Sequence, residues 1–314
     1  MAIKISTINF KGGVGKTTLT FHLATHLAKK SKVLVIDVDH QSSLSIVMMG
    51  GELWQDAVNN KRTCNSIFES FCNRRVISPS DEIIHRNILH TRSPKYDFYP
   101  NLDLVPAQFE LDDTEIEMAS TTMGSPIISE WHKRTLLAEW LDSVDANNNY
   151  DYIIFDCPPA TKLVSQNAIA ASDYFIVPVI PDAMSSRGVT HFRSLVNLKI
   201  DKKLEFLRTS ASISDSDIPK SYSPTTTLAA IVPFMAKKAG NAASGLTNNH
   251  TEQLVALRRQ WKSDMINTVV PSLTGIPEAL NMGWPVWTAY QTDNISRAKA
   301  PLVKACNEIE KRLV

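Results

Sequence analysis

The ten residues 9–18, NFKGGVGKTT, hold the densest group of chemically capable side chains in this sequence. Closely spaced glycines allow a tight backbone path whose successive N–H groups point toward the oxygens of a phosphate. A lysine that can neutralise phosphate charge follows them, and two threonines bring hydroxyls that can reach a metal ion. The loop expected to bind phosphate therefore comprises Gly12, Gly13, Val14, Gly15, Lys16, Thr17 and Thr18.

Within that loop, Lys16 is expected to reach the β- and γ-phosphates of a nucleotide, and Thr17 to ligate Mg²⁺. Two features depart from the usual phosphate loop: Phe10 stands where its first glycine is expected, and a second lysine, Lys11, comes five residues before Lys16. A strand pattern precedes the loop and a helix pattern follows it, which is the context such a loop requires. The sequence therefore predicts a site for ATP and Mg²⁺.

Acidic residues stand at the ends of two further strand patterns. Asp37 and Asp39 follow the apolar residues 33–36, and Asp156 ends the apolar run in YDYIIFDCPP. Because ligands of open α/β sheets bind beyond the carboxyl ends of the strands, we expect these carboxylates to converge on the phosphate loop. The place of Asp156 is that of a Walker B aspartate, which holds Mg²⁺ through water.

The elements that must position these residues alternate between strand and helix patterns. Short apolar segments with both faces apolar are typical of parallel strands covered by helices. The predicted strands are residues 3–8, 33–36, 102–105, 152–155, 174–179 and 228–232. The predicted helices are residues 16–30, 128–144, 187–199 and 251–261. This alternation predicts an α/β P-loop NTPase fold, with a mostly parallel, doubly wound sheet and helices on both faces.

The chain is expected to form one domain over residues 1–314, with no internal repeat. Residues 210–227 are rich in Ser, Thr and Pro and lack periodicity, so we predict a surface loop insertion there. Two interpretations of this loop stay open, a solvated insertion and a docking site for a partner.

Composition narrows the classes of function. The net charge is +1 and the sequence pI about 7.7, so DNA binding would need a local basic patch. The four cysteines form no CxxC pair and no zinc spacing, which favours a reducing, cytoplasmic location. No apolar stretch approaches the roughly 20 residues that a membrane-spanning helix needs, so we predict no membrane span.

Three motifs together resemble a known family. KGGVGKTT, VLVIDVDHQSS and YDYIIFDCPPA are similar to the deviant Walker A, A′ and B motifs of the ParA/MinD family of P-loop ATPases. NLDLVPAQFEL, ASDYFIVPVIPDAMSSRGV and GIPEALNMGWPVWTAY resemble later segments of that family, closest to its ParA partitioning branch. The resemblance covers nearly the whole chain and implies a slow, partner-stimulated ATPase that forms a homodimer on binding ATP.

The resemblance also implies roles for particular residues. Lys11 corresponds to the signature lysine, which crosses the dimer interface to contact phosphates bound by the other subunit, whereas Lys16 acts within its own subunit. A cation a few ångströms from a phosphate gains on the order of 4 kcal/mol at an effective dielectric near 20, so dimerisation would depend on ATP. Asp39 matches the aspartate that orients or activates the attacking water, and Asp37 is expected to support the Mg²⁺ shell or the lysines. His40 replaces the usual proline and removes no catalytic group.

The cargo of such an ATPase stays open. The partitioning branch binds nonspecific DNA as an ATP dimer, and a ParB-like partner then stimulates hydrolysis to segregate or position a plasmid, a chromosome or other cargo. Basic pairs in the C-terminal half are candidates for these DNA contacts, which would make the protein nucleoid-associated. They are Lys237, Lys238, Arg258 and Arg259.

Four alternatives remain. A nucleotide-switched signalling or assembly ATPase would act on a protein partner, and a small-molecule kinase would have no need of Lys11. An electron-transfer protein would need two well-placed cysteines in each subunit. A MinD-like membrane-associated ATPase would need a cationic interfacial tail. The apolar stripe from Ile295 to Leu313 instead faces mixed charges, which favours a terminal helix packed on the body.

Overall fold

The computed structural model describes residues 1–73, 75–92, 99–159, 162–182, 189–190, 193–239 and 245–313. In the described chain, a six-stranded sheet has the order β3-β2-β4-β1-β5-β6, and every pairing between neighbouring strands is parallel. The strands are β1 (Ile3–Thr7), β2 (Val33–Asp37), β3 (Leu102–Val105), β4 (Tyr152–Asp156), β5 (Tyr174–Val179) and β6 (Thr227–Pro233). The six predicted strands are thus confirmed to within one residue at each end, and the α/β fold class is confirmed.

The strands are apolar on both faces because helices cover both faces of the sheet. In β2, Leu34 and Ile36 belong to one buried cluster, whereas Val33 and Val35 belong to the other. Since alternate side chains of a strand point to opposite faces, the protein has one hydrophobic core on each side of the sheet.

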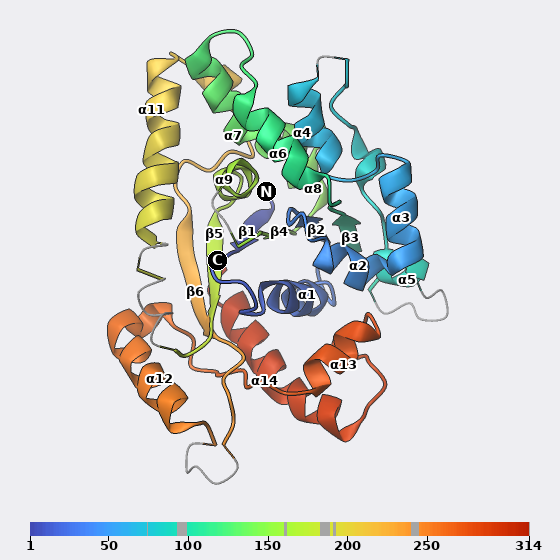
Figure 1. Cartoon of the computed structure of the whole chain (residues 1–314), viewed down its shortest axis with the longest axis vertical. Helices are drawn as coiled ribbons and strands as arrows, with labels where there is room; N and C mark the ends of the chain where they lie inside the picture. The colour runs from blue at the N-terminus through green and yellow to red at the C-terminus, as the bar shows by residue number, and fades with distance from the viewer. Residues whose placement is uncertain are drawn as a thin grey trace.

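The first core is covered by helices drawn mainly from the middle of the chain (Figure 1). They are α4 (Asn65–Cys72), α6 (Leu111–Ser120), α7 (Pro126–Ser143), α8 (Ala146–Asn149), α9 (Leu163–Ala170), η2 (Leu195–Asp201), α11 (Lys202–Ser210) and α12 (Asn248–Trp261). The second core is covered by helices from the two ends of the chain. They are α1 (Lys16–Leu27), α2 (Ser43–Met49), α3 (Gly51–Asn59), α5 (Ile88–Arg92), α13 (Gly275–Asn281) and α14 (Asp293–Glu310). Short 3₁₀ turns complete the described elements: η1 (Asp81–Ile83), η3 (Asp215–Asp217) and η4 (Lys262–Asp264).

The order of the strands creates a switch point in the middle of the sheet. The central strands β1 and β4 are neighbours, but α1 follows β1 onto one face and α9 follows β4 onto the other. Loops that leave adjacent strands in opposite directions open a crevice at the carboxyl edge of the sheet, where ligands of this architecture bind.

The helix predicted over residues 187–199 differs most from the structure. Residues 187, 188, 191 and 192 lie outside the described ranges. From Leu195 onward the chain winds as η2 with π-helical turns and continues through α11 to Ser210, eleven residues beyond the predicted end. The prediction stopped early because Lys199, Lys202 and Lys203 interrupt the apolar stripe, although the buried face continues through Leu204.

The predicted surface loop over residues 210–227 is only partly a surface loop. Residues 214–217 are exposed, as expected. The second half folds back onto the body: Ser221 bonds Asp142 at 2.6 Å, and the ring of Tyr222 lies edge-on to Trp131 with 5.1 Å between centroids. The sequence pattern did not predict that this segment packs on the body, because the segment is held by hydrogen bonds between polar side chains rather than by an apolar stripe.

The C-terminal stripe is packed as the sequence predicts. Ile295, Leu302 and Ile309 of α14 are fully buried in the second core, so the tail is a structural helix of the body. Among the described residues, no helix combines the length and the apolar character needed to cross a bilayer.

Candidate functional site

The phosphate loop occupies the crevice between β1 and α1. Its central residue, Val14, is fully buried and anchors the loop in the protein, while Gly12 and Gly13 are exposed. Gly13 and Gly15 have φ values of 71° and 87°, a left-handed region that favours glycine. A Cβ atom built on Gly12 or Gly13 would meet nothing within 4 Å, so the loop borders open space where a ligand can lie against its backbone.

Asn9 holds the start of this loop, a role that the motif did not reveal. Its side-chain amide donates to the carbonyl of Pro178 at the end of β5 at 2.7 Å. Its side-chain oxygen accepts from the backbone N–H of Lys11 at 3.0 Å. The loop is therefore tied to the neighbouring strand, and the available signal was a polar residue at the end of an apolar strand.

The two lysines of the loop lie in different surroundings. Lys16 is 7% exposed, and burial lowers the pKa of its ammonium, although the charges of Asp156 and Asp39 partly oppose that shift. Its ammonium donates to the carbonyl of Lys11 at 3.5 Å, a long contact that a phosphate oxygen could replace. The ammonium of Lys11 is much more exposed and forms a salt bridge with Asp182, which follows β5. The structure therefore separates a buried lysine from a surface lysine within one loop.

Asp156 connects the loop helix to the end of β4. One of its oxygens accepts from the hydroxyl of Thr17 at 2.7 Å, and the other accepts from Thr20 at 2.8 Å. Burial raises the pKa of Asp156 to about 7, and the two hydroxyl donors limit that rise. Thr20 was missed by sequence analysis, although it lies one helical turn after Thr17 and on the same side of α1.

Asp37 lies opposite Asp156 in the parallel pairing of β2 with β4. Its carboxylate accepts three hydrogen bonds, from the backbone N–H and the hydroxyl of Ser45 at 2.9 and 2.7 Å and from the N–H of Asp39 at 3.1 Å. Burial and the charge of Asp156 raise the pKa of Asp37 well above its ordinary value. Ser45, missed from the sequence, also accepts from the N–H of Ala107 after β3 and so joins two loops of the site.

Asp39 completes the acidic side of the crevice. Asp39 is 7% exposed, and its carboxylate accepts from the N–H of Gln41 at 3.0 Å. The ring of His40 lies 3.9 Å from the same carboxylate oxygen. The structure thus brings Asp37, Asp39 and Asp156 together beside Lys16. In the ranges that the structure describes, no group of three or more His, Cys, Asp or Glu side chains is arranged to hold a metal ion by itself.

An apolar cavity of about 270 Å³ lies beside the loop helix. It is lined by Thr18, by Phe234 and Met235 directly after β6, and by residues of α13 and of the segment leading into it. Met235 has a φ of 53°, which is uncommon for a residue other than glycine and which points to a position constrained by its surroundings. A Cβ on Gly15 would lie 2.5 Å from the ring of Phe234, so the loop and this cavity are packed directly together.

The four basic residues predicted to contact DNA lie in the segment after β6 and on α12. Lys237 and Lys238 follow β6, and both are exposed; the N–H of Lys237 donates to His250 in the first turn of α12 at 3.1 Å. Arg258 and Arg259 are exposed near the other end of α12, about 12 Å further along the helix axis at 1.5 Å per residue. The segment after β6 and α12 thus carry both pairs, but the length of α12 keeps the pairs from forming one cluster.

Comparisons with known proteins identify the relatives of this chain. A family model described as an AAA domain, AAA_31, matches residues 2–208. The sporulation initiation inhibitor protein Soj of Bacillus subtilis is 31% identical over 195 residues, 62% of this chain and 64% of Soj. The chromosome partitioning protein ParA of Myxococcus xanthus is 29% identical over 191 residues, 60% of this chain and 56% of ParA. The aligned part therefore spans less than two thirds of either relative.

Solved structures share the fold over a greater length. An ATP complex of a McdA variant from Cyanothece superposes with a TM-score of 0.67 and 18% identity, covering 99% of this chain and 96% of the other. At that identity the likeness concerns the fold alone.

Proposed function

Because this chain belongs to the AAA_31 family and, within it, to the ParA/MinD P-loop ATPases near the ParA branch, we propose that it is an ATP-timed dimer. In this proposal the protein binds ATP and Mg²⁺, dimerises, holds nonspecific DNA, and hydrolyses ATP slowly until a ParB-like or other partner stimulates it. Hydrolysis then releases the dimer, and the cycle segregates or positions a cargo.

The observation that carries the proposal is the arrangement of two lysines around one loop. Lys16 is buried beside three carboxylates and is available to phosphates of its own subunit. Lys11 lies on the surface of the same loop and can reach outward once it leaves Asp182. An enzyme that used ATP as a monomer would need the first lysine but not the second. The loop therefore suits a site that a second subunit completes.

The donor set beside Lys16 suits Mg²⁺. Thr17 can offer an oxygen lone pair to the metal while its hydroxyl donates to Asp156, as in the observed hydrogen bond. Mg²⁺ would supply neutralisation of the phosphate charge. Asp37 already accepts three hydrogen bonds, so we assign it to orienting Ser45 and Asp39 around the metal site rather than to direct ligation. Asp39 would orient the attacking water.

The cavity next to Thr18 provides a place for the nucleotide base. It is apolar, its volume of about 270 Å³ suits one aromatic ring system, and it adjoins the loop through Gly15 and Phe234. A base held there would position the phosphates along the loop. This would explain why Phe234 and Met235, which carry no catalytic group, belong to the site.

Two lysine variants test the proposal. Lys16→Ala should abolish tight nucleotide binding and reduce hydrolysis at least 100-fold, because a preorganised cation on the phosphates is removed. Lys11→Ala should retain nucleotide binding but lose ATP-dependent dimerisation, measured by sedimentation velocity with ATP and Mg²⁺. Lys30→Ala, an exposed lysine beyond α1, is the matched control and should behave as wild type. An ATP-dependent dimer that survives Lys11→Ala would contradict the trans role of this lysine.

A further inference from the structure

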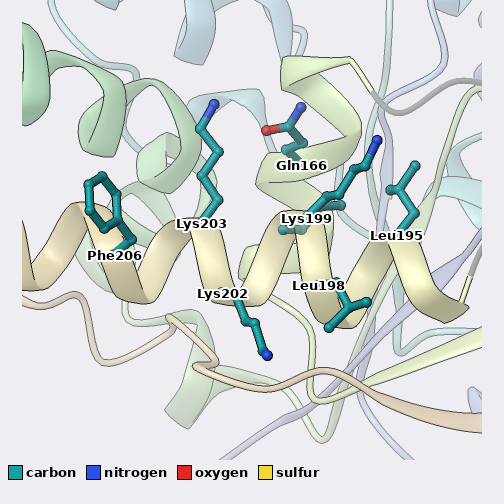
Figure 2. A pocket seen from close by; sticks show the side chains of 8 residues that line it. Gln166, Leu195, Leu198, Lys199, Lys202, Lys203 and Phe206 are labelled. Carbon is teal, nitrogen blue, oxygen red and sulfur yellow. The ribbon is translucent and has the colours of Figure 1, made fainter.

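The helices that cover the first core form a groove along one flank of the protein, and the nucleotide site does not use this groove. The groove has a volume of about 600 Å³ and lies between η2–α11 and Gln166 of α9. Figure 2 shows Lys199 and Lys203 rising from the helix on the same side as Gln166, with Phe206 at the far end of the groove and Leu198 and Lys202 along the other side of the helix. The π-helical winding of η2 is a rare conformation that is frequent at functional sites.

The exposed side of this helix combines free cations with apolar side chains. Leu198 is 53% exposed and Phe206 is 65% exposed. In the described part of the chain, none of the three lysines forms a salt bridge with a carboxylate. Burial and the nearby charge of Arg134 lower the pKa of Lys203, and the charge of Glu130 partly opposes that shift. We call Leu198, Lys199, Lys202, Lys203 and Phe206 the basic stripe.

A complementary surface lies close by on α6. Ile116 is 62% exposed, and Asp113 and Glu117 are exposed on the same side of that helix. Neither of these two carboxylates has a salt-bridge partner among the described residues, whereas Asp112 and Glu115 are paired with Lys162. The segment is therefore an acidic helix with an apolar residue at its exposed centre. We call Asp113, Ile116 and Glu117 the acidic stripe.

The two stripes flank one side chain. Gln166, whose oxygen accepts from Arg134 at 2.7 Å, lines the groove of the basic stripe. It also lines a second hollow, of about 340 Å³, beside Ile116 of the acidic stripe. A twofold axis near Gln166 would therefore set each stripe of one copy against the opposite stripe of another copy. Such self-complementarity is what a symmetric dimer contact requires.

We propose that this flank is a self-association surface, separate from the nucleotide dimer, on which the acidic stripe of one copy docks in the groove of a second copy. Ile116 enters the 600 Å³ groove, and Leu198 enters the 340 Å³ hollow beside the partner's acidic stripe. Asp113 and Glu117 face the lysines, and the symmetry makes every contact twice. The contact needs no nucleotide and leaves the loop of each copy open, so it can link ATP dimers into larger assemblies.

Sedimentation velocity of the nucleotide-free full chain tests this surface. At about 20 mM KCl the wild type should associate with rising concentration, and about 200 mM KCl should weaken that association, because exposed charge pairs are screened. Lys199→Glu/Lys203→Glu and Asp113→Lys/Glu117→Lys should each raise the dissociation constant about tenfold or more. Combining all four changes reverses both stripes and should restore association to near the wild-type level.

Matched variants distinguish the two stripes from a general effect of charge on the chain. Lys299→Glu/Lys304→Glu reverses two exposed lysines of α14 and should leave association unchanged, and circular dichroism should show every variant folded. Lys11→Ala should remove the ATP-dependent dimer but keep the nucleotide-free contact, so the two proposals fail independently. A wild type that stays monomeric at low salt would overturn the proposal and leave an acidic segment of another protein as the occupant. Failure of the fourfold swap to restore association would equally overturn it.

Discussion

The carboxyl edge of the sheet and the flank formed by η2, α11 and α9 use charge in opposite ways. At the edge, Asp37 accepts three hydrogen bonds and Asp156 accepts two, so each buried carboxylate is held in place by donors. On the flank, the lysines of the basic stripe are exposed, and Asp201 is buried with one oxygen that has no hydrogen-bond partner in the described chain. Buried hydrogen bonds therefore fix the charges at the edge, whereas the charges on the flank stay exposed to solvent.

This difference should appear as a difference in tolerance to substitution. Positions at the edge are fixed by backbone conformation and by buried hydrogen bonds, so single changes there should have large effects. Positions on the flank act through solvent-exposed electrostatics, where individual contributions are small and depend on salt. The effects of substitution should therefore decrease from the edge to the flank.

The largest effect is expected at Gly15. Gly15→Ala places a Cβ 2.5 Å from Phe234 and forces a left-handed residue, so the folded state should lose about 2 to 4 kcal/mol and nucleotide binding should fail. Gly13→Ala adds only the backbone strain, and Gly12→Ala meets open space without strain. Chemical denaturation and nucleotide titration should rank the three in that order. Equal effects at Gly12 and Gly15 would contradict the packing argument.

The two threonines that bond Asp156 should separate activity from stability. Thr17→Val removes the hydroxyl proposed to ligate Mg²⁺ and should reduce kcat about 100-fold with little change in folding. Thr20→Val removes a fully buried donor and should cost about 1 to 3 kcal/mol in the free energy of unfolding. Phosphate release and urea denaturation measure the two effects. A reversed pattern would mean that Thr20 rather than Thr17 faces the metal.

A smaller effect is expected for the exposed basic pairs. Lys237→Ala/Lys238→Ala should weaken binding of the ATP-bound protein to nonspecific DNA and reduce the slope of log affinity against log salt by about one for each lost phosphate contact. Arg258→Ala/Arg259→Ala should act less, because Arg258 already donates to the carbonyl of Asn267 at 2.9 Å. Lys30→Ala/Lys32→Ala serves as the charge-matched control. Absence of ATP-dependent DNA retention by the wild type at low salt would remove DNA from the proposed cycle.

The smallest effect is expected from Asp201, at the end of η2. Burial raises its pKa to about 6, above the ordinary value of 3.8, and the N–H of Thr226 only partly opposes this. The folded protein therefore favours the protonated form, and the contribution of Asp201 to stability is lost as the pH rises through about 6. Asp201→Asn should raise Tm by about 2 to 4 °C at pH 8 and leave it unchanged near pH 3.5.

The control for that pH experiment is Asp215→Asn, which alters an exposed carboxylate of η3. It should leave Tm unchanged at both pH values. If Asp201→Asn gave the same shift at low and high pH, its effect would come from packing rather than from titration.

The strands and the phosphate loop could be predicted because their signals are local. Apolar runs define buried parallel strands, and glycine spacing defines a loop with left-handed residues, whatever surrounds them. The helix through η2 and α11 was predicted too short, because its exposed lysines hide the buried positions Ile200 and Leu204. The second half of residues 210–227 was predicted as surface, because its docking depends on Asp142, far away in the sequence.

The sequence by itself determined the parallel sheet, the acidic residues at the ends of two strands, and the presence of two lysines in one loop. Each of these depends on residues within one turn or one strand of each other. Only the tertiary structure decided that Asn9 ties the loop to β5, that Ser45 joins the loops after β2 and β3, and that Phe234 closes the cavity beside Gly15. The residues in each of these contacts are far apart in the sequence, and the strand order brings them together. The sequence does not reveal such contacts, because burial and hydrogen bonding act between neighbours in space.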